Sequence, residues 1–340
     1  MDSLTQIVLG AACGEAVLGK KIGNKALLFG AIGGTIPDLD VFIGRFFYAN
    51  EIQIMAFHRG FMHSFLFAIL GCFVFGWITF KLYNSGKRIG TTTQNDWVQL
   101  FFWSIFTHPI LDSFTPYGTQ LFTPFSDYRV AFNTIAVADP AYTIPFLLCM
   151  IILMFFNRKR SRRTWWLKAG IVVSSVYLGF TVMNKIYMDS VFKKSFEKEG
   201  IAFHRCSTQP TILNNLLWYG VAESNDQYYV SYYSLFDSKT YTSQILPIPK
   251  THHILDMSDP NLRLLPWFSN GYYNLKKGKN KEEFIYTDLR YPMLNPKDPN
   301  SSVFNFIIYD NNGAWDILPF RGATPNSNDF KVFFERIKGI

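Results

Sequence analysis

The sequence predicts an α-helical, multi-pass membrane bundle of about six spans, followed by a small β-rich or α+β soluble domain. Three observations lead to this fold class. The long apolar runs are confined to residues 1–187, basic residues cluster beside these runs, and the composition becomes polar and aromatic afterwards. A chain of 340 residues also suits two domains of ordinary size. We therefore expect a transmembrane domain in residues 1–187 and a soluble domain in residues 188–340.

Six apolar segments define the expected spans. A transmembrane helix needs roughly 20 mainly apolar residues to cross about 30 Å of hydrocarbon. Five segments approach this length: 61–83, 135–156 and 165–186, which are clear, and 26–47 and 97–114, which polar side chains interrupt. Residues 4–18 form a shorter run around Glu15, which fits a tilted sixth span or a half-inserted helix.

The charge pattern predicts the orientation of these spans. Basic residues gather in three clusters beside the apolar runs: Lys20, Lys21 and Lys25; Lys81, Lys87 and Arg88; and RKRSRR at residues 158–163. Since cytoplasmic loops are rich in Lys and Arg, we expect both termini and the soluble domain on the extracytoplasmic side of a bacterial inner membrane. No basic segment precedes the first apolar run, so we expect it to be retained rather than cleaved. Topology thus accounts for the net charge of +8, and nucleic acid is not an expected partner.

Four polar motifs lie at the outer ends of the spans in this orientation. They are TIPDLD (35–40), HRGFMHS (58–64), THPILDSFTPYG (107–118) and VADPAY (137–142). An ionisable group within a span costs about 2.5–3.5 kcal/mol on insertion scales and usually faces the bundle interior or a wet cavity. Taken alone, each motif could equally be explained as a helix cap, a helix kink or an interfacial residue without a functional role. Their meeting at one membrane depth favours a single functional site.

The histidines and aspartates of these motifs are candidate metal ligands. The His and Asp of residues 107–118 are four apart and share one face of a helix. The two histidines of residues 58–64 converge if a helix begins after the first of them, and a break at Pro37 lets both aspartates reach inward. Imidazole and carboxylate ligands favour Zn²⁺, with Mn²⁺ and Fe²⁺ as alternatives, and one or two ions fit this many donors. The predicted ligands are Asp38, Asp40, His58, His63, His108 and Asp112.

The same motifs supply candidate catalytic residues. A metal ion with an open position lowers the pKa of bound water from 15.7 to about 7. A carboxylate that does not bind the metal could act as a general base, and Asp40 and Asp139 are the candidates. Arg59 and Arg129 are candidates to neutralise an anionic substrate or a developing negative charge.

These motifs resemble the YdjM-like family of inner-membrane proteins, described as LexA-binding and as metal-dependent hydrolases. The family pattern contains P-D-x-D, H-R-G-x-T-H-S and H-x-x-x-D-x-x-T-x-x-G, followed by P-F. Here it corresponds to Pro37, Asp38 and Asp40; His58, Arg59, Gly60, His63 and Ser64; His108, Asp112, Thr115 and Gly118; and Pro124 and Phe125. The chain departs from the pattern at Gln6, which replaces an early histidine, and at Met62, which replaces the threonine. The resemblance covers roughly residues 1–143 and implies metal-dependent hydrolysis. The chain is similar to longer members of the family, which have an appended outer domain.

The soluble domain is expected to form a mainly antiparallel sheet. β-forming runs at residues 216–224, 227–237, 282–291 and 303–311 are separated by turn-forming sequences, and residues 325–337 fit one short helix. His204, His252 and His253 lack a ligand-like spacing, so we expect them at the surface. The four cysteines indicate no disulfide framework.

The leading functional hypothesis is an integral membrane hydrolase. It would use a metal-activated water at the outer membrane face on a lipid or lipid-linked (phospho)ester, with membrane lipids as its partners. One alternative is a proton- or metal-coupled transporter, although the two halves show no internal similarity of the kind transporters often have. Another is a non-catalytic scaffold with a partner-binding outer domain. Neither the substrate nor the oligomeric state follows from the sequence.

Overall fold

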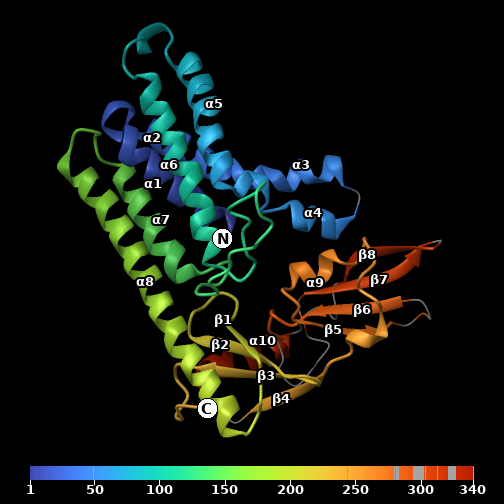
Figure 1. Ribbon diagram of the computed structural model, residues 1–340. Coiled ribbons are helices and arrows are strands. Elements are labelled where there is room, and N and C mark those ends of the chain that lie inside the picture. Colours follow the sequence, from blue (N-terminus) through green and yellow to red (C-terminus); the bar gives the residue numbers. More distant parts are fainter. Residues whose placement is uncertain are drawn as a thin grey trace. The chain divides into compact units, whose positions relative to one another are not determined.

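The computed structural model describes residues 1–48, 50–242, 244–278, 280, 283–293, 302, 304–311, 313–320 and 327–339. The chain forms two compact units. Residues 1–43 and 57–182 make up the helical unit, and residues 44–56 and 183–340 make up the β-rich unit. The expectation of a helical region followed by a β-rich region is confirmed, as Figure 1 shows along the chain.

The helices begin close to the amino terminus and are joined mostly by short connections, with a longer irregular segment at residues 114–139 between α6 and α7 (Figure 1). They are α1 (Ser3–Ile22), α2 (Asn24–Thr35), η1 (Pro37–Leu39), α3 (Asp40–Phe47), α4 (Glu51–Phe57), η2 (Phe61–His63), α5 (Phe65–Tyr83), η3 (Gly86–Arg88), α6 (Gln94–Ser113), α7 (Pro140–Met154) and α8 (Ser161–Lys198). Within the helical unit, α1 packs against α2, α6 and α7, and α5 packs against α6.

The expected six spans are not supported by these helices. Among the described residues, α5 and α8 are long and apolar enough to cross a membrane, and a third span results if α2 and the segment Pro37–Phe47, which are bent by 44°, count as one. Helix α1 carries Glu15 and two lysines, α6 carries polar residues at both ends, and α7 has 15 residues. At about 1.5 Å per residue, a helix of that length falls short of the roughly 30 Å of hydrocarbon.

Helices α1 and α2 approach each other backbone to backbone. Each carries a small residue motif of the GxxxG type, Gly10 with Gly14 in α1 and Gly30 with Gly34 in α2. A Cβ atom at Gly30 would lie 2.2 Å from the carbonyl oxygen of Gly10, and one at Gly14 would lie 2.1 Å from that of Ala26. Such motifs allow close helix packing in membranes. This contact fixes the two segments that precede the PDLD motif.

Adding one methyl group at this contact is expected to destabilise the helical unit. The new Cβ of Gly30→Ala meets backbone atoms of α1, which no rotamer change can move, so we expect a loss of about 1–3 kcal/mol. Gly179→Ala in α8 is the matched control because nothing lies within 4 Å of its added Cβ. The control should be neutral or slightly stabilising. Thermal unfolding of both variants in detergent measures the difference, and equal midpoints would contradict the packing.

In the described residues, the β-rich unit contains two four-stranded antiparallel sheets, each with its strands in sequence order. The first consists of β1 (Arg205–Pro210), β2 (Leu217–Glu223), β3 (Gln227–Ser234) and β4 (Ile245–Pro249); the second of β5 (Tyr273–Lys277), β6 (Glu283–Asp288), β7 (Asn305–Asn311) and β8 (Ala314–Phe320). Helix α9 (Leu264–Phe268) precedes β5, and α10 (Ser327–Ile337) confirms the expected late helix.

Strand β2 shows why the first sheet is buried on both faces. Successive side chains of a strand point to opposite faces. Leu217 and Val221 join a core that also contains Leu289 from the segment after β6, whereas Trp218 packs with Phe192 of α8. The end of α8 therefore covers one face of this sheet.

The three remaining histidines lie in the β-rich unit. His204 and His253 are exposed as expected. His252 is half-buried instead: its ring stacks on Tyr273 at 3.9 Å between centroids, and its Nε2 lies 2.9 Å from the carbonyl oxygen of Tyr273. The expectation of a surface position is therefore wrong for His252, because the aromatic strands provide a face for the ring.

Candidate metal centre

A helix break brings the PDLD motif to the site. Helix α2 ends at Thr35, and Pro37 starts the short turn η1 before α3 begins at Asp40. Proline lacks a backbone N–H and suits the first position of such a turn. The side chain of Asp38 is 19% exposed, whereas that of Asp40 is 1% exposed. The turn thus places one carboxylate partly exposed and the other fully buried.

A strained turn presents the HRG motif. Arg59 has a φ of 63°, a left-handed conformation that is uncommon for residues other than glycine. A Cβ at Gly60 would lie 2.8 Å from the carbonyl oxygen of Phe57, so this position requires glycine. The strained backbone lets the Arg59 N–H donate to Asp40 Oδ2 at 3.0 Å. Backbone strain of this kind is found preferentially at functional sites.

Helix α6 supplies a histidine and an aspartate from one face. His108 and Asp112 are each 1% exposed in their side chains. His108 Nδ1 lies 2.6 Å from the carbonyl oxygen of Gly34, and since a carbonyl only accepts, Nδ1 carries the proton. In the neutral ring, Nε2 then offers a lone pair to the site. The end of α2 therefore sets the tautomer of His108.

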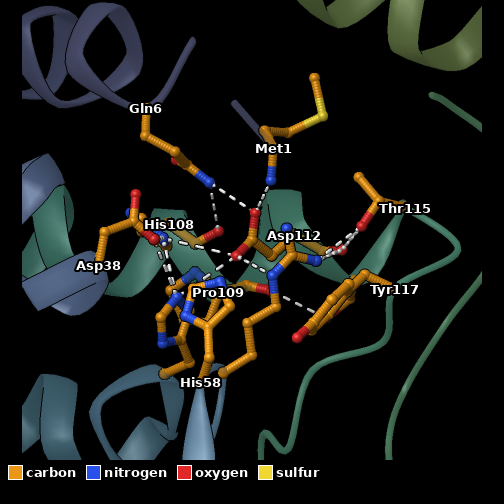
Figure 2. A network of polar contacts seen from close by, with 12 residues as sticks. Met1, Gln6, Asp38, His58, His108, Pro109, Asp112, Thr115 and Tyr117 are labelled. Atoms are coloured by element: carbon orange, nitrogen blue, oxygen red, sulfur yellow. Dashed lines mark hydrogen bonds and ion pairs between the residues drawn. The ribbon is translucent and has the colours of Figure 1, made fainter. Parts of the chain in front are cut away.

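Four ligand atoms converge in what we call the inner group, which consists of Asp38, His63, His108 and Asp112. The two Nε2 atoms lie 3.1 Å apart. His63 Nε2 lies 3.4 Å from both Asp38 Oδ1 and Asp112 Oδ2. His108 Nε2 lies 3.4 Å and 3.5 Å from the same two oxygens. Figure 2 shows Asp38 from the turn after α2 close to His108 and Asp112 of α6.

The inner group fits a divalent metal ion. Ligands bonded to a tetrahedral ion at about 2.0–2.1 Å are spaced about 3.3–3.4 Å apart, which matches the observed separations. Arg59 Nε lies 3.2 Å from Asp112 Oδ2, but neither atom has an aligned hydrogen bond among the described residues. A buried carboxylate oxygen without an aligned donor, such as Asp112 Oδ2, is costly. A cation held by all four would remove that cost.

A second set of contacts, the outer group of Asp40, His58 and His63, has a different spacing. Asp40 Oδ1 lies 2.7 Å from His58 Nδ1. Asp40 Oδ2 lies 3.0 Å from His63 Nδ1, although that contact lacks hydrogen-bond alignment. These are hydrogen-bond distances. Burial lowers the pKa of His58 more than the Asp40 carboxylate raises it, so the imidazole is neutral at pH 7.

Gln6 of α1 and the amino group of Met1, which precedes α1, contact the inner group. Gln6 Nε2 donates to Asp112 Oδ1 at 2.8 Å and to the carbonyl oxygen of His108 at 3.2 Å. The amino group of Met1 contacts the same carboxylate (Figure 2). The sequence left the role of Gln6 open and gave no indication of Met1. Gln6 holds a ligand in place through its amide.

Tyr117 lies between two arginines. Arg59 stacks on its ring at 4.7 Å and Arg129 at 4.9 Å. Arg59 Nη1 also donates to Thr115 Oγ1 at 2.8 Å, and Arg129 Nη2 donates to the Tyr117 carbonyl oxygen at 2.6 Å. Arg59 therefore adjoins the inner group, and Arg129 lies one ring further away. Thr115 and Tyr117 were not among the predicted site residues, although both lie within the THPILDSFTPYG motif that signalled the site.

Asp139 lies outside both groups. Its carboxylate caps α7 by accepting the N–H groups of Ala141 and Tyr142, and Oδ2 accepts the Tyr177 hydroxyl at 2.9 Å. The sequence places Asp139 near the outer ends of the spans, but depth alone does not decide where a side chain points.

Comparison with known proteins gives this chain a family. Residues 1–187 match the family described as YdjM inner membrane protein. The chain belongs to this family, which confirms the resemblance, and the family and the candidate spans together place it in a membrane. The uncharacterized protein YfhP of Bacillus subtilis (strain 168) is 28% identical over 162 residues, 45% of this chain and 46% of YfhP. The chain thus spans about half the length of this curated relative. No solved structure matches it.

Proposed function

We propose that the protein is a membrane-bound, metal-dependent hydrolase that acts on a lipid or lipid-linked phosphoester at the extracytoplasmic surface. One observation carries this proposal: the four ligand atoms of the inner group are spaced like the ligands of a tetrahedral metal ion, and three of the four side chains are buried while Asp38 is 19% exposed. Membership of an inner membrane protein family supports a substrate within reach of the bilayer.

The inner group would hold the metal through Asp38, His63, His108 and Asp112. A divalent ion there, with Zn²⁺ favoured by two imidazoles and two carboxylates, supplies Lewis acidity and hydroxide at neutral pH. The chain itself fixes the ligands. Gln6 and the Gly34 carbonyl hold Asp112 and His108 from α1 and α2.

The outer group fits a positioning role. Asp40 faces the N–H of Arg59, His58 Nδ1 and His63 Nδ1, so its oxygens are already engaged. A carboxylate behind a ligating histidine fixes the ring and typically changes metal affinity by about 10–100-fold when removed. We therefore assign Asp40 to orienting His63 rather than to acting as a ligand or a general base. Asp139, as a helix cap, does not fit the role of base either.

Arg59 favours a phosphoester over a carboxylic ester. Its guanidinium lies beside the inner group and carries the fixed charge and donor geometry that suit phosphate oxygens. The stacking on Tyr117 holds this group in a defined orientation. Arg129, which contacts the same ring, would add positive charge for the rest of an anionic substrate.

Purified full-length protein tests the function directly. We expect about one equivalent of transition metal and metal-dependent release of phosphate or a phosphomonoester from a phospholipid or lipid-linked phosphodiester. Arg59→Gln should lower phosphoester turnover by about 100-fold or more, the cost of losing one electrostatic stabiliser of the reaction, without loss of the metal. The matched control is Lys87→Gln, which removes an exposed charge remote in sequence from these motifs. Metal-free protein with unaltered turnover, or turnover of carboxylic esters alone, would contradict the proposal.

A further inference from the structure

A basic cavity lies in the helical unit at the end of α1 and the start of α8. It has a volume of about 770 Å³ and is lined by Lys20, Arg158, Lys159, Arg160, Trp165 and Lys168, together with two hydroxyl side chains. Cavities of roughly 300–1,000 Å³ are the size in which small ligands bind. None of the residues that line it belongs to the inner or outer group.

The charges of this cavity are not neutralised within the described part of the chain. Lys20, Lys159, Arg160 and Lys168 form no ion pair there, and Arg158 donates only to the carbonyl oxygen of Lys21. Neighbouring cations behave differently. Lys21 pairs with Asp96 at 2.6 Å, and Arg163, a few residues further along α8, pairs with Glu15. The cavity therefore gathers the basic residues that lack an acidic partner.

The start of α8 adds to this positive potential. The helix begins at Ser161 and is 38 residues long, and the amino terminus of a helix carries a partial positive charge with N–H groups that bind anions. The hydroxyls of Ser161 and Thr164 line the same cavity. Five cations, two hydroxyl donors and a helix terminus are together suited to a phosphate group.

The position of the cavity identifies the source of that phosphate. Among the described residues, α8 is one of two helices long and apolar enough to cross a membrane. Its apolar run begins at Trp165, directly after the basic segment, so we expect its first turns at the depth of the lipid headgroups. Trp165 is 60% exposed, and tryptophan is enriched at this level of a membrane. Basic pockets between membrane helices bind anionic headgroups. We propose that this cavity binds the headgroup of an anionic phospholipid, separately from the metal centre.

Lipid titration of the purified full-length protein in detergent tests this site. Native mass spectrometry with dioctanoyl phosphatidylglycerol and dioctanoyl phosphatidylcholine should show saturable binding of the first and at least about 10-fold weaker binding of the second. The triple variant Lys20→Gln, Lys159→Gln, Lys168→Gln should bind phosphatidylglycerol roughly 100-fold more weakly, since each basic residue near an anionic surface contributes about a fivefold factor.

A second triple variant controls for charge alone. Lys81→Gln, Lys87→Gln and Arg162→Gln remove the same charge from exposed positions outside the cavity, and affinity should change less than about twofold. Equal losses in both variants, or equal affinity for the two lipids, would overturn the proposal. Displacement by millimolar inorganic phosphate would instead show a site for free anions. If the first triple variant fails to fold, Lys159→Glu in the exposed loop, compared with Lys87→Glu, decides the question.

Discussion

Replacing His108 by alanine is expected to abolish stoichiometric metal binding and, with it, hydrolysis. His108 Nε2 lies within 3.5 Å of three other members of the inner group, and its loss leaves two carboxylates and one imidazole. Removal of a residue that only orients a metal ligand lowers metal affinity by about 10–100-fold. We therefore expect a loss of metal affinity beyond about 100-fold when a ligand itself is removed. Metal analysis after dialysis, followed by calorimetric titration with Zn²⁺, measures this.

Two further substitutions make the result specific. Asp40→Asn should retain about one equivalent of metal at saturation but bind it about 10–100-fold more weakly, because Asp40 acts through His63. His253→Ala, an exposed histidine of the β-rich unit, should bind metal as the wild type does. A His108→Ala protein with a full equivalent of metal would refute the inner group, and loss of all metal in Asp40→Asn would make Asp40 a ligand.

Replacing Arg163 by methionine is expected to destabilise the helical unit by about 3–5 kcal/mol, the typical cost of breaking a buried ion pair. Arg163 donates to both carboxylate oxygens of Glu15 at 2.6 Å. It also donates to Asn24 Oδ1 at 2.6 Å and to the Phe156 carbonyl oxygen at 2.9 Å. Both partners of the pair are buried, so the substitution leaves an uncompensated carboxylate. Denaturant unfolding in detergent reports the loss.

The double variant Glu15→Leu, Arg163→Met separates charge from packing. Because it removes both buried charges, it should be more stable than Arg163→Met alone, as apolar replacements of buried pairs often are. Arg162→Met, one residue away and exposed, should change stability by less than about 0.5 kcal/mol. If the double variant loses as much stability as the sum of the losses in the two single variants, Arg163 contributes through its other acceptors, such as the Phe156 carbonyl oxygen, and not through Glu15.

The convergence of the candidate ligands was predictable from spacing, but their division into two groups was not. The i, i+4 pair of His108 and Asp112 and the turn at Pro37 indicated convergence of these motifs. Which aspartate of PDLD faces His108 depends on a single 3₁₀ turn, and the separation of inner from outer contacts rests on differences of about half an ångström. No sequence pattern carries that information, so the sequence predicts all six residues as candidate ligands of one site.

The fold was predictable where the side-chain period was clear. Strands β2, β3, β6 and β7 follow alternating or β-branched and aromatic runs. The runs at β4 and β8 contain proline, and β5 ends in two lysines, so local propensity did not identify them. The count of spans failed for a different reason, because α7 is too short and α1 and α6 carry charged or polar residues within their apolar runs.

The glycine contact between α1 and α2 links the chemistry of the site to the architecture of the bundle. Gly34 lies against the backbone of Gly10 and also offers its carbonyl to His108, while Gln6, one turn before Gly10, holds Asp112. Loosening this helix contact would therefore move the carbonyl that sets the tautomer of His108, a candidate metal ligand. The packing of these two helices and the orientation of the candidate ligands are thus coupled through the same glycines.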